Sequence, residues 1–304
     1  MNFKNALFKP SKLTKPNTGG YVYHDPRITL AVNVALATRR PLLVTGVPGA
    51  GKSTLAADVA SKLNWAYLPM TVTSRTRLED LVARLDAVKR LNDAQANVAK
   101  EPEAYLIPGV LWWAFDATSA AELPAAHDPR VDPAQSGNGT VVLLDEIDKA
   151  EPDLPNDLLE PLDRYSITVP GRGVIESAHN VLAVITSNGE RAMPPAFLRR
   201  CVVLELDDDD PDFFISVAIS HFGSRTDSLY ADVANRTIEL GRLADESRNR
   251  RPSMAEYLDT VRACIEFGER PPTAAGRGAS ALWSAIEETA LRKTRKPGRE
   301  APGG

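Results

Sequence analysis

Short apolar runs alternate with helical patterns along the first two thirds of the chain. Continuous apolar runs bounded by turn signals are typical of strands buried on both faces. Such runs predict five strands, over residues 42–45, 65–72, 141–144, 181–185 and 202–206. Apolar residues recur at helical spacing between them, as in 28–38 and 52–63. Because strands alternate with helices, we predict an α/β fold with a parallel five-stranded sheet flanked by helices.

The pattern changes after the acidic run at residues 207–210. From 212 to about 294 the periodicity is only helical, so we expect an α/β domain over 21–210 and an all-helical lid domain over 211–294. Prolines and glycines among lysines in residues 1–20 favour an extended N-terminal arm. Residues 295–304 are expected to form a flexible tail.

Composition narrows the functional classes. The 304 residues include 36 Lys and Arg against 40 Asp and Glu, a net charge of -4 that argues against a general nucleic-acid binder. Cys201 and Cys264 have no partner motif, so neither a disulfide framework nor a zinc site is expected. No stretch approaches the length of a membrane span. We expect a cytoplasmic protein.

The segment GVPGAGKS at residues 46–53 matches G-x-x-x-x-G-K-[ST] between a predicted strand and a predicted helix. Its glycines allow successive backbone N–H groups to point into one concavity that holds phosphate oxygens. Lys52 would reach the β- and γ-phosphates, and Ser53 would offer a hydroxyl to Mg²⁺. The alternative is a glycine turn with an exposed lysine, but the order strand, loop, helix favours a nucleotide site.

Two later strands end in polar residues. After VVLL, Asp145 can hold Mg²⁺, and Glu146 can polarise a water for attack on the γ-phosphate, which implies hydrolysis rather than transfer. The strand VLAVITS is followed by Asn188, whose amide could orient that water. A solvated acidic turn and an ordinary Ser-Asn-Gly turn are the alternatives.

The paired arginines Arg199 and Arg200 precede the last predicted strand. Arginine suits a developing phosphoryl charge because its planar fork stays ionised and binds oxygens bidentately. From this edge of the fold the pair would reach a neighbouring subunit's nucleotide. The alternative is an arginine bound to a carboxylate of its own chain.

Together these motifs resemble AAA+ ATPases, and in detail the MoxR-type branch of the helix-2-insert clade. The resemblance covers roughly residues 21–294 and is carried by RRPLLVTGVPGAGKST, LLDEIDKAEPDLPNDLLEPLD, ITSN and MPPAFLRRC. It implies that Asp145 and Glu146 are Walker B, that Asn188 is sensor 1, and that Arg200 is the arginine finger, assisted by Arg199. It also implies a Walker A motif made of Gly46, Val47, Pro48, Gly49, Ala50, Gly51, Lys52, Ser53 and Thr54.

The same resemblance interprets segments that composition leaves open. Residues 80–110 would be the insert in the second helix, and 166–178 the hairpin before sensor 1; related machines use such elements to line the ring's pore or touch the substrate. Residues 118–139, rich in Ala, Pro, Asp and Gly, are expected to form a mobile loop. Trp112 and Trp113 are expected to pack under the insert rather than contact a ligand.

One segment departs from the branch. MoxR proteins usually carry a sensor 2 arginine in a G-A-S-P-R-A-like segment, and alignment on Ser253 places Ala255 at that arginine's position. Arg250 or Arg251, just before the predicted helix, could reach the γ-phosphate instead. Either could also pair with a neighbouring carboxylate.

The leading hypothesis is therefore an ATP- and Mg²⁺-dependent AAA+ ATPase that forms a homo-oligomeric ring, expected to be a hexamer, and remodels or activates a partner protein. A client or adaptor with a von Willebrand factor A domain is one candidate, by the resemblance. The alternative is a DNA-associated motor or a component of a nucleic-acid defence system, using Lys89, Arg90, Arg172 and the basic residues 292–296. A small-molecule kinase is disfavoured by Glu146 and the helical domain. The chain has no N-K-x-D guanine motif, so we expect ATP rather than GTP.

Overall fold

The computed structural model describes residues 21–124, 138–177, 179–206, 210–247, 250–272 and 278–292. These residues divide into two compact units. The first comprises residues 25–46 and 51–206, and the second comprises residues 21–24 and 47–50 with the described part of the chain from 210 onward. The N-terminal arm (1–20) and the tail (295–304) lie outside the described residues.

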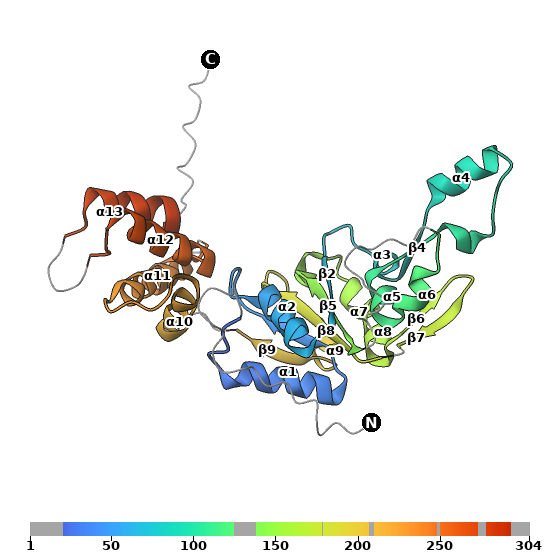
Figure 1. Cartoon of the computed structure of the whole chain (residues 1–304), viewed down its shortest axis with the longest axis horizontal. Coiled ribbons are helices and arrows are strands. Elements are labelled where there is room, and N and C mark those ends of the chain that lie inside the picture. The colour runs from blue at the N-terminus through green and yellow to red at the C-terminus, as the bar shows by residue number, and fades with distance from the viewer. Residues whose placement is uncertain are drawn as a thin grey trace, which may run out of the picture. The chain divides into compact units, whose positions relative to one another are not determined.

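A five-stranded parallel sheet forms the centre of the first unit (Figure 1). Its order is β2-β5-β8-β1-β9. The register pairs Leu144 with Ile185 and Thr45 with Ser187, so the carboxyl ends of the three central strands meet at one edge. The predicted parallel α/β fold is thereby confirmed. The strands are β1 (Leu42–Thr45), β2 (Ala66–Thr71), β5 (Thr140–Asp145), β8 (Val181–Ser187) and β9 (Val202–Glu205).

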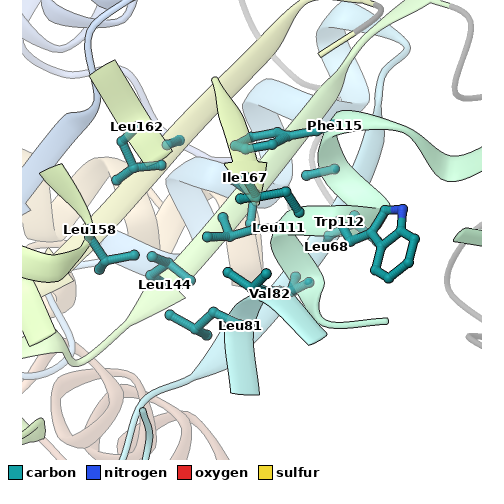
Figure 2. Packing of buried hydrophobic residues seen from close by; sticks show 14 of the residues in the cluster. Leu68, Leu81, Val82, Leu111, Trp112, Phe115, Leu144, Leu158, Leu162 and Ile167 are labelled. Atoms are coloured by element: carbon teal, nitrogen blue, oxygen red, sulfur yellow. The ribbon is translucent and has the colours of Figure 1, made fainter. Parts of the chain in front are cut away.

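Buried side chains from strands and helices of this unit form a hydrophobic cluster (Figure 2). Leu144 of β5 packs in the same cluster as Trp112, Phe115, Leu158 and Ile167. Both tryptophans are buried, as packing under the insert requires: Trp112 is fully inaccessible and Trp113 is 6% exposed. The helices of the unit outside its insert are α1 (Pro26–Thr38), α2 (Lys52–Leu63), α5 (Val110–Phe115), α6 (Ala117–Ala121), α7 (Leu154–Asp157), α8 (Leu159–Arg164) and α9 (Pro195–Leu198).

The expected insert at residues 80–110 and the residues just before it fold into short helices and strands. They form α3 (Leu78–Val82), β3 (Ala83–Leu85), α4 (Ala87–Gln95), the 3-10 turn η2 (Pro102–Tyr105) and β4 (Leu106–Pro108), with β3 and β4 paired antiparallel. Asp86 starts α4 by accepting the N–H of Lys89. Helix α4 stands away from the sheet and buries no residue (Figure 1).

Two further segments bear on the predicted organisation. The expected mobile loop at 118–139 is helical where it begins, in α6, because Asp116 caps the helix by accepting the N–H of Ser119 and Ala120 is buried. Residues 125–137 of that loop lie outside the described residues. Strands β6 (Ser166–Val169) and β7 (Gly173–Glu176) form an antiparallel hairpin before β8.

The second unit is helical in the part that the structure describes. Phe214, Val233, Tyr257, Val261 and Trp283 belong to its separate core. Its helices are α10 (Pro211–Phe222), α11 (Leu229–Glu246), α12 (Met254–Phe267) and α13 (Ala281–Ile286), followed by the π-helical turn η5 (Glu287–Arg292). Across the described residues of both units, no helix is long and apolar enough to cross a membrane.

Candidate functional site

The loop between β1 and α2 is a cradle built around glycine. Gly46, Gly49 and Gly51 have φ values of 148°, 88° and 85°, a region that side chains with a β-carbon rarely adopt. Gly51 caps α2 without a side-chain hydrogen bond, so the positive end of the helix is left for an anion. Lys52 is only 6% exposed, and its ammonium donates to the Gly46 carbonyl at 2.7 Å. The remaining loop positions of the motif are Val47, Pro48, Ala50 and Thr54, and Thr54 is exposed in the first turn of α2.

Ser53 and Asp145 meet at the carboxyl edge of the sheet. The Ser53 hydroxyl lies 2.8 Å from one carboxylate oxygen of Asp145 and 2.9 Å from the other. Hydroxyl and carboxylate oxygens are hard donors that suit Mg²⁺. No cluster of three or more His, Cys, Asp or Glu side chains capable of holding a metal occurs among the described residues. The hydroxyl of Ser53 and the carboxylate of Asp145 fit a Mg²⁺ ion that would share its remaining ligands with phosphate oxygens and water, as Mg²⁺ usually does.

Thr186 of β8 joins the two acidic residues at the end of β5. Its hydroxyl donates to Asp145 Oδ1 at 2.5 Å and accepts the backbone N–H of Glu146 at 2.9 Å. Asp145 is thus fixed from two sides, by hydrogen bonds from Ser53 and from Thr186. The pKa of the neighbouring Tyr67 phenol is raised by burial and secondly by the charge of Asp145, so this phenol stays protonated at neutral pH.

Glu146 leaves the sheet in an uncommon backbone conformation. Its φ of 62° and ψ of 49° lie in the left-handed region, which non-glycine residues seldom adopt and which concentrates at functional sites. The Asn188 amide lies 3.4 Å from Glu146 Oε1, so the structure brings together the two residues assigned to the attacking water. The Lys149 ammonium donates to Oε2 at 2.7 Å, and this hydrogen bond raises the pKa of Lys149.

The two arginines at the end of α9 differ in their contacts. Arg200 Nε lies 2.6 Å from Asp163 Oδ2, with nearly half of the arginine side chain exposed. Arg199 is exposed and forms no ion pair with any residue in the described ranges. The structure thus shows the intrachain pairing that was the alternative for Arg200, although an ion pair this exposed stabilises little. Action of either arginine on a neighbouring subunit stays a prediction.

Arg250 and Arg251 are both paired inside the second unit. Arg250 lies 3.0 Å from Glu256, the residue that completes the capping box of α12 with Ser253. Arg251 lies 2.8 Å from Asp245. These contacts give each arginine a structural role, and nucleotide sensing by either one stays a prediction.

Three residues of this site were missed from the sequence: Thr186, Asp148 and Lys149. The signal for Thr186 was present, since two polar residues, Thr186 and Ser187, close a strand whose every residue is buried. Asp148 is 3% exposed and accepts backbone N–H groups from the Asn188 segment. Its spacing from Glu146 gives no hint of those partners, which lie some 40 positions later.

The chain is similar in part to one curated protein and to several solved structures. Over 91 residues, 30% of this chain and 25% of the relative, the chain is 33% identical to the aerobic cobaltochelatase subunit CobS of Sinorhizobium sp., so the match spans a quarter of that protein. Two structures of RuvB from Thermotoga maritima are also similar. A mutant form has 17% identity and a TM-score of 0.45 over 86% of this chain and 69% of the other. The second RuvB structure, described as the Holliday junction branch migration motor, has 16% identity and a TM-score of 0.44 over 86% of this chain and 67% of the other.

The family model "AAA domain (dynein-related subfamily)" matches residues 41–201, more than half of the chain. This range contains the phosphate loop, Asp145, Glu146, Asn188 and the two arginines that follow α9. An AAA domain generally implies nucleotide binding and ATPase activity. The chain belongs to the dynein-related subfamily of AAA domain proteins.

Proposed function

We propose that this protein hydrolyses ATP with Mg²⁺ and uses the energy, in a ring of identical subunits, to remodel or activate a partner protein. The observation that carries the proposal is the convergence of Ser53, Asp145, Glu146 and Asn188 at one sheet edge, beside a glycine-rich loop with Lys52. Side chains from the ends of two strands, β5 and β8, and from the start of helix α2 meet there, as phosphoryl transfer to water requires.

In this proposal, each group has one task. The N–H groups of the loop and Lys52 bind the β- and γ-phosphates. Ser53 and Asp145 hold the metal ion, which neutralises charge on the phosphate oxygens when bound. Glu146 takes the proton of the attacking water, and Asn188 orients that water against Glu146. The Lys149 ammonium shares Glu146, so the carboxylate is already held when the water binds.

The ring part of the proposal rests on the arginines and on the family. Arg199 and Arg200 both keep exposed side chains at the end of α9, from which a guanidinium can enter a neighbouring subunit's site. The curated relative CobS is named as a subunit of a cobaltochelatase, so that protein acts in an assembly. We extend this to a MoxR-type hexamer with a client or adaptor protein, for which a von Willebrand factor A domain is one candidate.

The test is the ATPase rate per subunit across a wide range of protein concentration, with Mg²⁺ and excess ATP. A rate per subunit that rises steeply and then saturates is expected, because assembly completes each site. A flat, substantial rate from a chain that is monomeric at the lowest concentration would overturn the ring, and no ATPase activity at any concentration would overturn hydrolysis itself.

A further inference from the structure

Asp148 lies in the 3-10 turn η4 (Ile147–Lys149) that follows Glu146, and it is 3% exposed. One of its oxygens, Oδ2, accepts the backbone N–H of Asn188 at 3.0 Å and that of Glu190 at 3.1 Å. The other oxygen, Oδ1, is buried and has no hydrogen-bond partner among the described residues. The carboxylate therefore directs its hydrogen bonds at a single target, the turn that carries Asn188.

Burying a carboxylate with one oxygen unpartnered lowers the free energy of unfolding unless the hydrogen bonds of the other oxygen offset that cost. Hydrogen bonds from backbone N–H groups to a charged acceptor are shorter and stronger than neutral ones. The acceptor is an aspartate side chain, which has only two rotatable bonds, and the donors are backbone N–H groups. The positions of both the acceptor and the donors are therefore restricted. Asp148 thus contributes a rigid support for the backbone of residues 188–190.

Further contacts join the same two loops. Arg191 donates to the Ala150 carbonyl at 2.5 Å, and the Glu146 N–H donates to Thr186 at 2.9 Å. The segments 146–150 and 186–191 are therefore linked along their whole length, with Asp148 in the middle. The Asn188 amide, which lies 3.4 Å from Glu146, is carried by the part of the turn that Asp148 holds.

We propose that Asp148 is a positioning residue for hydrolysis: it holds the backbone at Asn188 and Glu190 so that the Asn188 amide stays directed at Glu146. This inference rests on the proposed function, because it assigns Asn188 and Glu146 to the attacking water. Asp148 touches neither water nor nucleotide in this role and acts only through Asn188. Removing it should slow the chemical step without weakening nucleotide binding.

The first test compares kcat and nucleotide affinity in Asp148→Ala, Asp148→Asn, and Asp157→Ala as the control. Asp157 is an exposed aspartate of α7 in the segment that follows the same turn. In Asp148→Ala, kcat should fall by roughly tenfold to hundredfold while the nucleotide Kd changes less than about threefold. Asp148→Asn keeps one oxygen acceptor, so its kcat should lie between those of Asp148→Ala and the wild type. The kcat and nucleotide Kd of Asp157→Ala should match those of the wild type. A loss of affinity with kcat unchanged would overturn the proposal.

A double-mutant cycle separates positioning from a general structural effect. If Asp148 acts through Asn188, then Asp148→Ala combined with Asn188→Ala should be no slower than Asn188→Ala alone. Rate losses that multiply in the double variant would show that Asp148 works by another route and would overturn the inference. If Asp148→Ala does not fold, the same cycle is run with Asp148→Asn.

Hydrogen exchange of the peptide that covers residues 186–191 gives a readout independent of turnover. Faster exchange in Asp148→Asn than in Asp157→Ala, confined to this peptide, is expected because two N–H groups lose a charged acceptor. Unchanged exchange would overturn the inference even with an active enzyme. A wild type without ATPase activity would overturn the proposed function instead, while the exchange result would still decide whether Asp148 holds this backbone.

Discussion

Thr186 and Asp145 are joined across adjacent strands by a hydrogen bond of 2.5 Å from the threonine hydroxyl to carboxylate Oδ1. The same hydroxyl accepts the N–H of Glu146, so one side chain fixes both acidic residues at the end of β5. Thr186 is fully buried, which removes water as a competing partner for these bonds. The spacing between Asp145, the proposed metal ligand, and Glu146, the proposed base, therefore depends on Thr186, which has neither role in the proposal.

Replacement of Thr186 by valine should impair hydrolysis, although the two side chains have nearly the same shape. Valine keeps the volume but removes a donor to a charged group and leaves the Glu146 N–H without its acceptor, a loss of about 1.5–3 kcal/mol. If that loss falls on the transition state, kcat drops roughly tenfold to hundredfold. Thr186→Ser is the matched control, because it keeps the hydroxyl and should retain most of the activity. Equal rates for the two variants would show that the hydroxyl has no part in the chemistry.

Glu146 and Lys52 should fail in different ways. Glu146→Gln keeps the size and a polar contact to Asn188 but cannot take a proton, so we expect ATP to bind and hydrolysis to stall. Lys52→Ala removes the ammonium that the loop holds beside Gly46, so we expect nucleotide binding itself to be lost. Equilibrium binding of a fluorescent ATP analogue, together with single-turnover hydrolysis, separates the two effects. Normal turnover by Glu146→Gln would refute its assignment as the base.

Prediction from sequence succeeded where one segment carries its own signal. The apolar runs at 42–45, 141–144 and 181–185 predicted three strands, two of which extend to Asp145 and Ser187 in the structure, and parallel pairing then brings their polar ends to one edge. Prediction from sequence failed for pairs of residues that only tertiary packing brings into contact. Asp148 and Asn188 are 40 positions apart in the sequence. Arg200, just after α9, pairs with Asp163 in the last turn of α8. The strands β3 and β4 were missed because three-residue strands are too short for a period to show.

Arg200 gives a direct test of action between subunits. Arg200→Ala should lose most hydrolysis and keep its nucleotide affinity, because in the proposed ring the arginine serves the neighbour's transition state rather than its own binding site. Mixing it with Lys52→Ala protein should restore part of the activity, since some intact nucleotide sites then meet an intact arginine from a neighbouring subunit. Arg164→Ala, in the exposed last turn of α8, is the control and should retain activity. Failure of a well-formed mixed ring to recover activity would place the action of Arg200 inside its own chain.

In the second unit, Glu287 should stabilise the fold in a pH-dependent way. It is 7% exposed, and its carboxylate accepts two hydrogen bonds of 2.8 Å from Arg236 and one of 2.7 Å from Arg292. Burial acts to raise the pKa of Glu287, but the hydrogen bonds and charges of the two arginines outweigh it and hold the pKa below its usual value. Glu287→Gln should therefore lower the stability of this unit at pH 7, by roughly 2–3 kcal/mol, near the low end for buried pairs because Arg236 is partly exposed.

The pH dependence of that loss follows from the direction of the pKa shift. A carboxyl group whose pKa is lower in the folded than in the unfolded chain adds stability above the unfolded value, and that stability disappears as the pH falls through the folded value. The difference between wild type and Glu287→Gln should thus be full at pH 7 and shrink steadily below about pH 4. Urea denaturation followed by circular dichroism at several pH values measures it, with the exposed neighbour in Glu288→Gln as the control. A difference that stays constant down to pH 2.5 would mean that shape, and not charge, makes Glu287 stabilising.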